Sequence, residues 1–162
     1  MSVSTAVAKE ISFEVGQAAP DFNLPTDSGA KVSLAELKGK KVVLYFYPKD
    51  DTPGCTIEAK EFRDNIDAFT AANTVIIGVS KDSVKSHDKF KEKHCLPFAL
   101  ASDEDGDVCE RYGVWVEKAM YGKKYMGIQR ATFLIDENGK FLKIWAKVSV
   151  DGHVDEVLAA VQ

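Results

Sequence analysis

The most restrictive feature of the sequence is an apolar run typical of a strand that is buried on both faces. Residues 41–47 are almost all apolar, β-branched or aromatic, and the run ends at Pro48. A strand with one face in water would alternate apolar and polar side chains, so this run requires layers of structure on both sides of its sheet. Residues 74–80 form a second such run. The two runs predict an α/β fold with a buried central sheet.

Helical patterns alternate with these strands. Apolar side chains recur at steps of four and three from Cys55 to Phe69, which predicts one helix with a buried face. Ser83 can cap a second helix that ends at His94. The other expected elements are a small N-terminal hairpin around the turn 26–29, a strand at 98–100, a short helix at 103–112, a strand at 131–135, its antiparallel partner at 140–147 and a closing helix at 151–161. The order predicts a central mixed sheet flanked by helices.

The composition favours one ordered domain. The chain has 162 residues, of which 45% are hydrophobic and 28% charged, and no linker-like or low-complexity stretch divides it. We therefore expect a single domain over residues 1–162, with about the first 12 residues loose.

Charge and hydropathy exclude several classes of partner. With 21 Lys and Arg against 25 Asp and Glu, the net charge is −4, so we expect no binding to nucleic acid or to an anionic membrane. No apolar run approaches the roughly 20 residues that span a bilayer. The first residues also lack the pattern of a cleaved signal, and we expect a cytoplasmic protein.

Cysteines and histidines give no metal-binding pattern. Cys55, Cys95 and Cys109 are too few for a disulfide scaffold and too far apart for a zinc knuckle or a CxxC motif. His87, His94 and His153 complete neither an HExxH motif nor a Cys–His ligand set. The sequence predicts no metal site.

Cys55 occupies a position that can make a thiol reactive. It follows a loop that leaves a buried strand and stands at the start of a helix, where unpaired backbone N–H groups and the helix dipole stabilise a thiolate. One helix terminus contributes only about 0.3–1 kcal/mol when exposed and up to about 2 kcal/mol when partly buried, so strong activation needs a cation as well. The alternative is that Cys55 simply begins the apolar face of its helix.

The residues around Cys55 resemble a known family. The segment 48–55 contains the pattern Pro-x-x-x-Thr-x-x-Cys of peroxiredoxins, and the string Phe-Tyr-Pro-Lys-Asp-Asp-Thr-Pro-Gly-Cys-Thr-Ile-Glu-Ala at 46–59 is similar to their bacterioferritin-comigratory-protein branch, PrxQ. Similarity continues, in order, at 79–83, 85–90, 112–115, 121–123 and 127–136, which together cover nearly all of the chain after about residue 12.

This resemblance implies a thioredoxin-like fold and a thiol-dependent peroxidase that reduces hydrogen peroxide and organic hydroperoxides. Cys55 would be the nucleophile and would become a sulfenic acid. It implies no metal or organic cofactor. A thioredoxin-type protein or a small thiol would be the reductant, and the protein would be a monomer.

The resemblance also assigns five residues around the nucleophile. Arg130 would supply the cation and face both thiolate and peroxide. The Thr52 hydroxyl would accept from the thiol or peroxide and donate to the developing charge, while Pro48 would shield the sulfur. The backbone N–H of Gly54, with that of the nucleophile, would stabilise the stretched O–O bond. Glu58 would hold the arginine. Each residue also has a purely structural explanation when taken singly. Pro48 could shape a turn, the Thr52 hydroxyl could be hydrogen-bonded within the loop, and the two charged side chains could form a surface ion pair.

The chain lacks a cysteine at the two positions where members of this branch usually carry their second, resolving cysteine. Lys60 stands five residues after the nucleophile, where many members of the branch have a resolving cysteine, and Lys91 aligns with the position used by others. We expect one-cysteine turnover with an external thiol. The alternative is internal resolution by Cys95, if the ends of its helix unwind, whereas Cys109 is better explained as a packed core residue.

A non-catalytic binding module on the same fold is the rival from another class. Such a module would not need Pro48, Thr52, Cys55 and Arg130 together. A disulfide reductase is disfavoured because it would need a CxxC pair.

Overall fold

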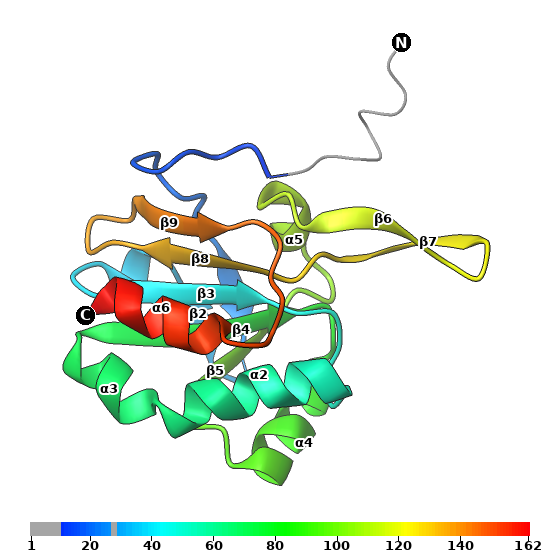
Figure 1. Cartoon of the computed structure of the whole chain (residues 1–162), viewed down its shortest axis with the longest axis horizontal. Coiled ribbons are helices and arrows are strands. Elements are labelled where there is room, and N and C mark those ends of the chain that lie inside the picture. Colours follow the sequence, from blue (N-terminus) through cyan, green and yellow to red (C-terminus); the bar gives the residue numbers. More distant parts are fainter. Residues whose placement is uncertain (1–10, 27–28) are drawn as a thin grey trace.

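A five-stranded mixed sheet forms the centre of the fold in the computed structural model, which describes residues 11–26 and 29–162 (Figure 1). The loose start expected for about the first 12 residues falls largely on residues outside this description. In spatial order the strands are β5 (Ala99–Ser102), β4 (Thr74–Ser80), β3 (Lys41–Phe46), β8 (Ala131–Ile135) and β9 (Phe141–Trp145). Because β3 is parallel to β4 and antiparallel to β8, the sheet is mixed, as the sequence predicts.

The side chains of β3 alternate between two apolar cores. Val43 and Tyr45 pack into the core beneath α2 (Pro53–Asp64), α3 (Ile66–Ala71), α4 (Val84–His94) and α6 (His153–Val161). Leu44 and Phe46 pack into the core on the other face, under the short helix α5 (Val108–Arg111) and the N-terminal segments. These segments include the expected hairpin, β1 (Asn23–Pro25) and β2 (Lys31–Ser33), and the 3-10 turn η2 (Ala35–Leu37). Both faces of the sheet are therefore covered, which explains why its central strand carries no polar alternation.

Two helices differ from the expectation. The helix expected to run from Cys55 to Phe69 is interrupted at Asn65, whose side-chain amide donates to the Glu61 carbonyl 2.8 Å away and separates α2 from α3. The helix expected over 103–112 spans only Val108–Arg111. Asp103 instead accepts hydrogen bonds from the first backbone N–H groups of α5, so it lies outside the helix.

A projecting β-hairpin is the longest element that the sequence analysis missed, besides the short 3-10 turn η2. It consists of β6 (Trp115–Met120) and β7 (Lys123–Ile128), which extend away from the body of the molecule in Figure 1. Its turn uses positive φ angles at Tyr121 (53°) and Gly122 (78°), the combination that two-residue hairpin turns favour. Within the described residues, no helix is long and apolar enough to cross a membrane.

Candidate active site

The loop between β3 and α2 places Cys55 in the first turn of a helix. Thr52 is the N-cap with extended backbone, and Pro53 takes the first helical position, where a missing N–H does no harm. The first helical hydrogen bond runs from the Thr56 N–H to the Thr52 carbonyl, 2.8 Å away. The N–H groups of Gly54 and Cys55 therefore precede the helical ladder and are directed toward the helix start. Cys55 itself is 2% exposed.

Arg130 meets Cys55 because of the strand order. β8 runs antiparallel to β3, with Ala131 opposite Phe46. Arg130, the residue just before β8, therefore lies beside the end of β3, where the loop that leads to α2 begins. We call this loop, residues 47–52, the catalytic loop. Arg130 Nη2 is 3.3 Å from Cys55 Sγ. The same guanidinium reaches Glu58 Oε1 through Nη1, at 2.6 Å. One planar fork thus joins the sulfur to a buried carboxylate.

The charged groups of this site shift one another's pKa values. Burial raises the pKa of Glu58 to about 7, and the guanidinium of Arg130 opposes that rise. Burial alone would lower the pKa of Arg130, but Glu58 and Cys55 together raise it. Lys118 of β6, which the sequence analysis did not single out, is affected by the charges of Arg130 and Cys55. Burial and then Arg130 lower its pKa, whereas Cys55 raises it.

The other loop residues expected at the site have different surroundings. The Thr52 hydroxyl donates to the Lys49 carbonyl, 2.9 Å away, and so stabilises the loop. Pro48 is exposed and lines a cavity of about 340 Å³ between the loop and the β6–β7 hairpin. Gly54 lies against the guanidinium, because a Cβ atom there would stand 3.3 Å from Arg130 Nη2. A glycine at this position thus leaves room for the arginine.

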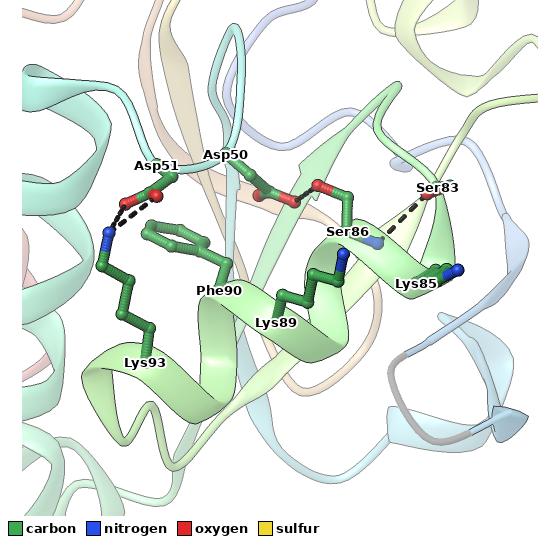
Figure 2. Close-up of a pocket in the computed structure, with 8 residues that line it drawn as sticks. All are labelled: Asp50, Asp51, Ser83, Lys85, Ser86, Lys89, Phe90 and Lys93. Carbon is green, nitrogen blue, oxygen red and sulfur yellow. Dashed lines mark hydrogen bonds and ion pairs between the residues drawn. The ribbon is translucent and has the colours of Figure 1, made fainter.

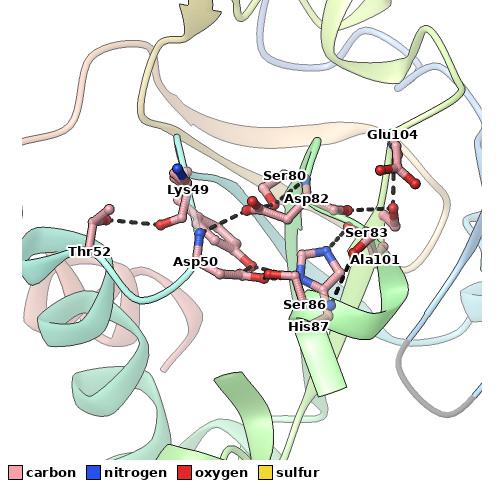
Figure 3. Close-up of polar contacts among 12 residues, drawn as sticks. Lys49, Asp50, Thr52, Ser80, Asp82, Ser83, Ser86, His87, Ala101 and Glu104 are labelled. Atoms are coloured by element: carbon pink, nitrogen blue, oxygen red, sulfur yellow. Dashed lines mark hydrogen bonds and ion pairs between the residues drawn. The ribbon is translucent and has the colours of Figure 1, made fainter. Parts of the chain in front are cut away.

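A buried polar network, which sequence reasoning missed, anchors the loop between β3 and α2 to α4 and β5 (Figure 3). The Asp50 carboxylate accepts from Tyr47 Oη at 2.6 Å and from Ser86 Oγ at 2.8 Å, and it contacts His87 Nδ1 at 2.7 Å. His87 Nε2 faces the Ala101 carbonyl at 3.1 Å. Both nitrogens of this fully buried ring face oxygen atoms, so the ring links Asp50 of the loop to β5.

The same cluster bears on the expectation that the chain holds no metal. Donor atoms of Asp50, Asp82 and His87 lie within 4.8 Å of one another. Each is already engaged by the protein, since Asp82 accepts from the Asp50 N–H and from Ser80 Oγ, both at 2.7 Å. A metal ion would have to displace these hydrogen bonds, so the absence of a metal site stays our prediction.

The loop is also fastened to the end of α4. The Asp51 carboxylate pairs with Lys93 Nζ at 2.9 Å, across a cavity of about 390 Å³ that also involves Phe90 (Figure 2). Arg63 of α2 donates to the His94 carbonyl at 2.8 Å. These contacts connect the loop, through Asp51, and the last turn of α2, through Arg63, to the last turn of α4 and restrain that turn.

The two remaining cysteines lie in contrasting surroundings. Cys95 is exposed and caps α4 in the left-handed conformation, with φ at 52°. Cys109 is fully buried in α5, and burial together with Asp103 raises the pKa of its thiol far above the usual range. All three cysteines are free thiols.

Comparisons with known proteins agree with this geometry. Residues 15–144 match the model of the AhpC/TSA family. The chain is 62% identical to a putative peroxiredoxin Bcp of Coxiella burnetii over 91% of this chain and 98% of that protein, and 53% identical to peroxiredoxin Bcp of Bacillus subtilis over 91% and 94%. A solved bacterioferritin comigratory protein of Xanthomonas campestris, described for alkyl peroxide reduction, superposes with a TM-score of 0.85 at 43% identity and covers 91% of this chain and 97% of its own.

A buried cysteine at a helix start, a guanidinium fork on its sulfur and this degree of likeness lead to one conclusion. The chain belongs to the AhpC/TSA family, in the Bcp (PrxQ) branch of the peroxiredoxins, and is a thiol-dependent peroxidase with a thioredoxin-like fold.

Proposed function

We propose that this peroxidase turns over with Cys55 as its only essential cysteine and with an external thiol as reductant. The observation that carries the proposal is the contact between Arg130 Nη2 and Cys55 Sγ, at 3.3 Å, which the structure provides for neither of the other two cysteines within its described residues. The substrates are hydrogen peroxide and organic hydroperoxides, and a thioredoxin-type protein or a small thiol supplies the electrons.

The oxidation step needs only groups that this chain supplies. The Cys55 thiolate attacks one peroxide oxygen, a sulfur–oxygen bond forms, and the O–O bond breaks. The departing oxygen takes up a proton and leaves as water or an alcohol, while the sulfur becomes a sulfenic acid. A reductant thiol then forms a mixed disulfide with Cys55 and releases water. A second thiol frees the enzyme by thiol–disulfide exchange.

Each neighbouring group has a role in this step. Arg130 stabilises the thiolate and orients the peroxide with its fork, and Glu58 positions Arg130. The N–H groups of Gly54 and Cys55, at the positive end of α2, stabilise charge on the stretched peroxide. Thr52 holds the loop through Lys49 in this state, and its hydroxyl is available to the peroxide once substrate is bound. Pro48 limits access of water to the sulfur.

The surroundings of the other cysteines favour an external reductant. The raised pKa of the Cys109 thiol leaves it without thiolate character, and its side chain is fully buried. Cys95 is accessible, but the turn before it is fastened by Arg63 and by the Asp51–Lys93 pair. Resolution by Cys95 would require these contacts to break.

Intact-mass analysis after one equivalent of peroxide, without reductant, tests the proposal. We expect a gain of one oxygen on Cys55, conversion to a mixed disulfide with an added small thiol, and sulfinic acid in excess peroxide. A loss of two hydrogens that Cys95→Ser abolishes would show internal resolution instead. Cys55→Ser should remove peroxide consumption, whereas Cys95→Ser and Cys109→Ser should keep the first step. Peroxide consumption by Cys55→Ser would overturn the assignment of the nucleophile.

We also infer a single-domain monomer in a reducing, cytoplasmic compartment. Three free thiols suit such a compartment, and the two apolar cores share one sheet. Light scattering of the reduced protein at micromolar concentration would measure the oligomeric state, and a mass twice that of the chain would refute the monomer.

A further inference from the structure

Helix α4 presents three lysines on one face. Lys85, Lys89 and Lys93 follow one another at steps of four residues and line the cavity of about 390 Å³ beside the catalytic loop (Figure 2). We call these three exposed residues the lysine face. Lys93 is paired with Asp51, but the ammonium groups of Lys85 and Lys89 have no hydrogen-bond or ion-pair partner in the part of the chain that the structure describes.

The lysine face opposes the stability of its own helix. Like charges four residues apart on a helix repel each other, and Lys89 has such a neighbour on both sides. Lys85 also stands in the first turn of α4, where the helix dipole disfavours a cation and where no acidic residue is present. A local arrangement that disfavours the fold is expected at a functional surface. Carboxylates of a partner would relieve the repulsion among these lysines.

The lysine face lies at the edge of the sheet where Cys55 also stands. β3 and β4 are parallel neighbours, so the loops that lead from them to α2 and to α4 leave the sheet at the same edge. The catalytic loop contacts both ends of the lysine face, because Asp50 accepts from Ser86 Oγ at 2.8 Å and Asp51 pairs with Lys93 at 2.9 Å.

A protein that covers the lysine face is within reach of the nucleophile. Asp51 is four residues before Cys55, so their Cα atoms are at most about 14 Å apart, the extended length of four residues. Lys85 is eight residues from Lys93, which is about 12 Å along the helix. One protein–protein interface of ordinary size spans these distances. The same partner can therefore contact the lysines and approach Cys55 Sγ.

The charges around the lysine face favour an acidic protein over a polyanion. The net charge of the chain is −4, which opposes long-range attraction of a nucleic acid. Asp50 and Asp51 line the same cavity and would repel a continuous row of phosphates. Carboxylates on a protein surface are separate groups, which can lie against Lys85 and Lys89 alone. Such complementarity raises the association rate and orients the partner.

We propose that the lysine face docks the protein that reduces oxidised Cys55, through carboxylates that border the reactive thiol of that protein. The inference rests on the external reductant proposed above. In the step that it serves, the reductant thiolate attacks the Cys55 sulfenic acid, a disulfide bond forms between the two sulfurs, and the hydroxyl group leaves with a proton as water. A second thiolate of the reductant then attacks the reductant sulfur of this mixed disulfide. Cys55 leaves as a thiolate, and the reductant dithiol has become a disulfide.

Reduction of the sulfenic acid by two different reductants tests this role. The protein is oxidised with one equivalent of hydrogen peroxide and is then mixed with a thioredoxin of net negative charge or with dithiothreitol, a small uncharged dithiol. With thioredoxin, Lys85→Glu/Lys89→Glu should react about tenfold more slowly than the parent at low ionic strength, and the difference should shrink as salt is raised. With dithiothreitol the two proteins should react at equal rates. Oxidation of Cys55 by hydrogen peroxide should be equally fast in both.

Lys40→Glu/Lys140→Glu is the matched control. Both lysines are exposed and immediately precede strands, β3 and β9, that run parallel to each other, so they lie at the edge of the sheet opposite the catalytic loop. This double variant changes the net charge by the same amount and should stay within about twofold of the parent with thioredoxin. Lys85→Arg/Lys89→Arg keeps the charge of the lysine face and should also stay near the parent.

A parental rate for Lys85→Glu/Lys89→Glu with thioredoxin would overturn the proposal. Equal losses in this variant and in the control would do so too, because net charge alone would then explain the effect. An equal loss with dithiothreitol would place the lysines in the chemistry of Cys55, and an equal loss with the small anionic thiol 2-mercaptoethanesulfonate would indicate a subsite for small anions. Either result would refute docking of a protein. Failure of the proposed function is a separate result, because the oxidised parent would then lose two hydrogens without any added thiol.

Discussion

Glu58 and Arg130 form a buried ion pair in which only one carboxylate oxygen is engaged. Glu58 Oε1 lies 2.6 Å from Arg130 Nη1, whereas Oε2 is buried and has no hydrogen-bond partner among the described residues. A carboxylate with one unsatisfied oxygen is held less firmly in its ionised form than a fully solvated one. The pair can therefore change its charge near neutral pH while the hydrogen bond remains.

We expect Glu58→Gln to remove an ionisation near pH 7 from the pH dependence of Cys55 oxidation. In the parent, Glu58 gains its charge as the pH rises through its pKa of about 7 and then offsets part of the field of Arg130 at the sulfur. Glutamine accepts the same hydrogen bond without this charge, so above pH 8 the variant should be about threefold faster than the parent. Stopped-flow rates from pH 5 to 9 measure the effect. Glu92→Gln, at an exposed position on α4, is the control, and identical profiles for parent and Glu58→Gln would refute the expectation.

Acid stability should depend on His153. This ring is 1% exposed, contacts Thr132 Oγ1 through Nε2 at 2.7 Å, and has its pKa lowered to about 4 by burial and by Arg130. Because the folded-state pKa lies below the unfolded value of 6.5, its contribution to stability is present above pH 6.5 and is lost as the pH falls through 4. The loss reaches about 3 kcal/mol, and His153→Gln should lack it.

Urea unfolding at several pH values measures the contribution of His153 to the free energy of unfolding. Glu58→Gln serves as the control, because the contribution of Glu58 depends on pH in the opposite direction. Folding favours the protonated form of Glu58, so its contribution is full below about pH 4.5 and is lost as the pH rises through 7. The two residues oppose each other over overlapping pH ranges. Parallel curves for the parent and His153→Gln between pH 4 and 6.5 would show that the ring is not held neutral.

Arg130→Lys should oxidise Cys55 at least tenfold more slowly than the parent. Lysine keeps the positive charge, but one ammonium cannot reproduce the two contacts of the guanidinium, to Cys55 Sγ at 3.3 Å and to Glu58 Oε1 at 2.6 Å. Second-order rates with hydrogen peroxide measure the loss. Arg111→Lys, whose guanidinium pairs with exposed Asp107, should leave the rate unchanged, and a parental rate for Arg130→Lys would rule out the role of the fork.

His87→Phe should destabilise the fold by about 3 kcal/mol, because it leaves the buried Asp50 carboxylate without one of its hydrogen-bond partners. Adding Asp50→Asn should recover part of this loss, as expected for a coupled pair. Chemical denaturation measures both effects. His94→Gln removes a long contact to exposed Asp51 at 3.4 Å and a ring contact with Phe90, and it should change stability by less than about 1 kcal/mol. Strictly additive losses would show that His87 and Asp50 are not coupled.

The buried strands were the most predictable part of the fold. β3 and β4 are apolar throughout because both of their faces are covered, and that pattern can be recognised without a structure. The β6–β7 hairpin could not be found in this way. Most of its residues are exposed or half-buried on both faces, so no alternation of polar and apolar side chains marks it. Its Tyr121-Gly122 turn was the remaining signal.

Within the site, the residues that could be predicted from the sequence were those close to Cys55 in the chain and those that belong to the family motifs. Cys55 and Glu58 lie on one helical turn, and Arg130 was accessible through the resemblance alone. The contact of Asp50 with His87 and the electrostatic effect of Arg130 on the pKa of Lys118 join separate elements, which neither spacing nor composition encodes. These residues became recognisable only when the hairpin and α4 were placed against the catalytic loop.

Because β3 pairs with β8, the distance between the nucleophile Cys55 and the cation Arg130 does not depend on the length of the chain between them. Cys55 and Arg130 are 75 positions apart, yet the alignment of Phe46 with Ala131 sets their separation. An insertion or a proteolytic cut at the Tyr121-Gly122 turn leaves that alignment intact. A slip of β8 by one residue against β3 would turn Arg130 toward the opposite face of the sheet. Tolerance to sequence length and sensitivity to register therefore coexist in the same catalytic pair.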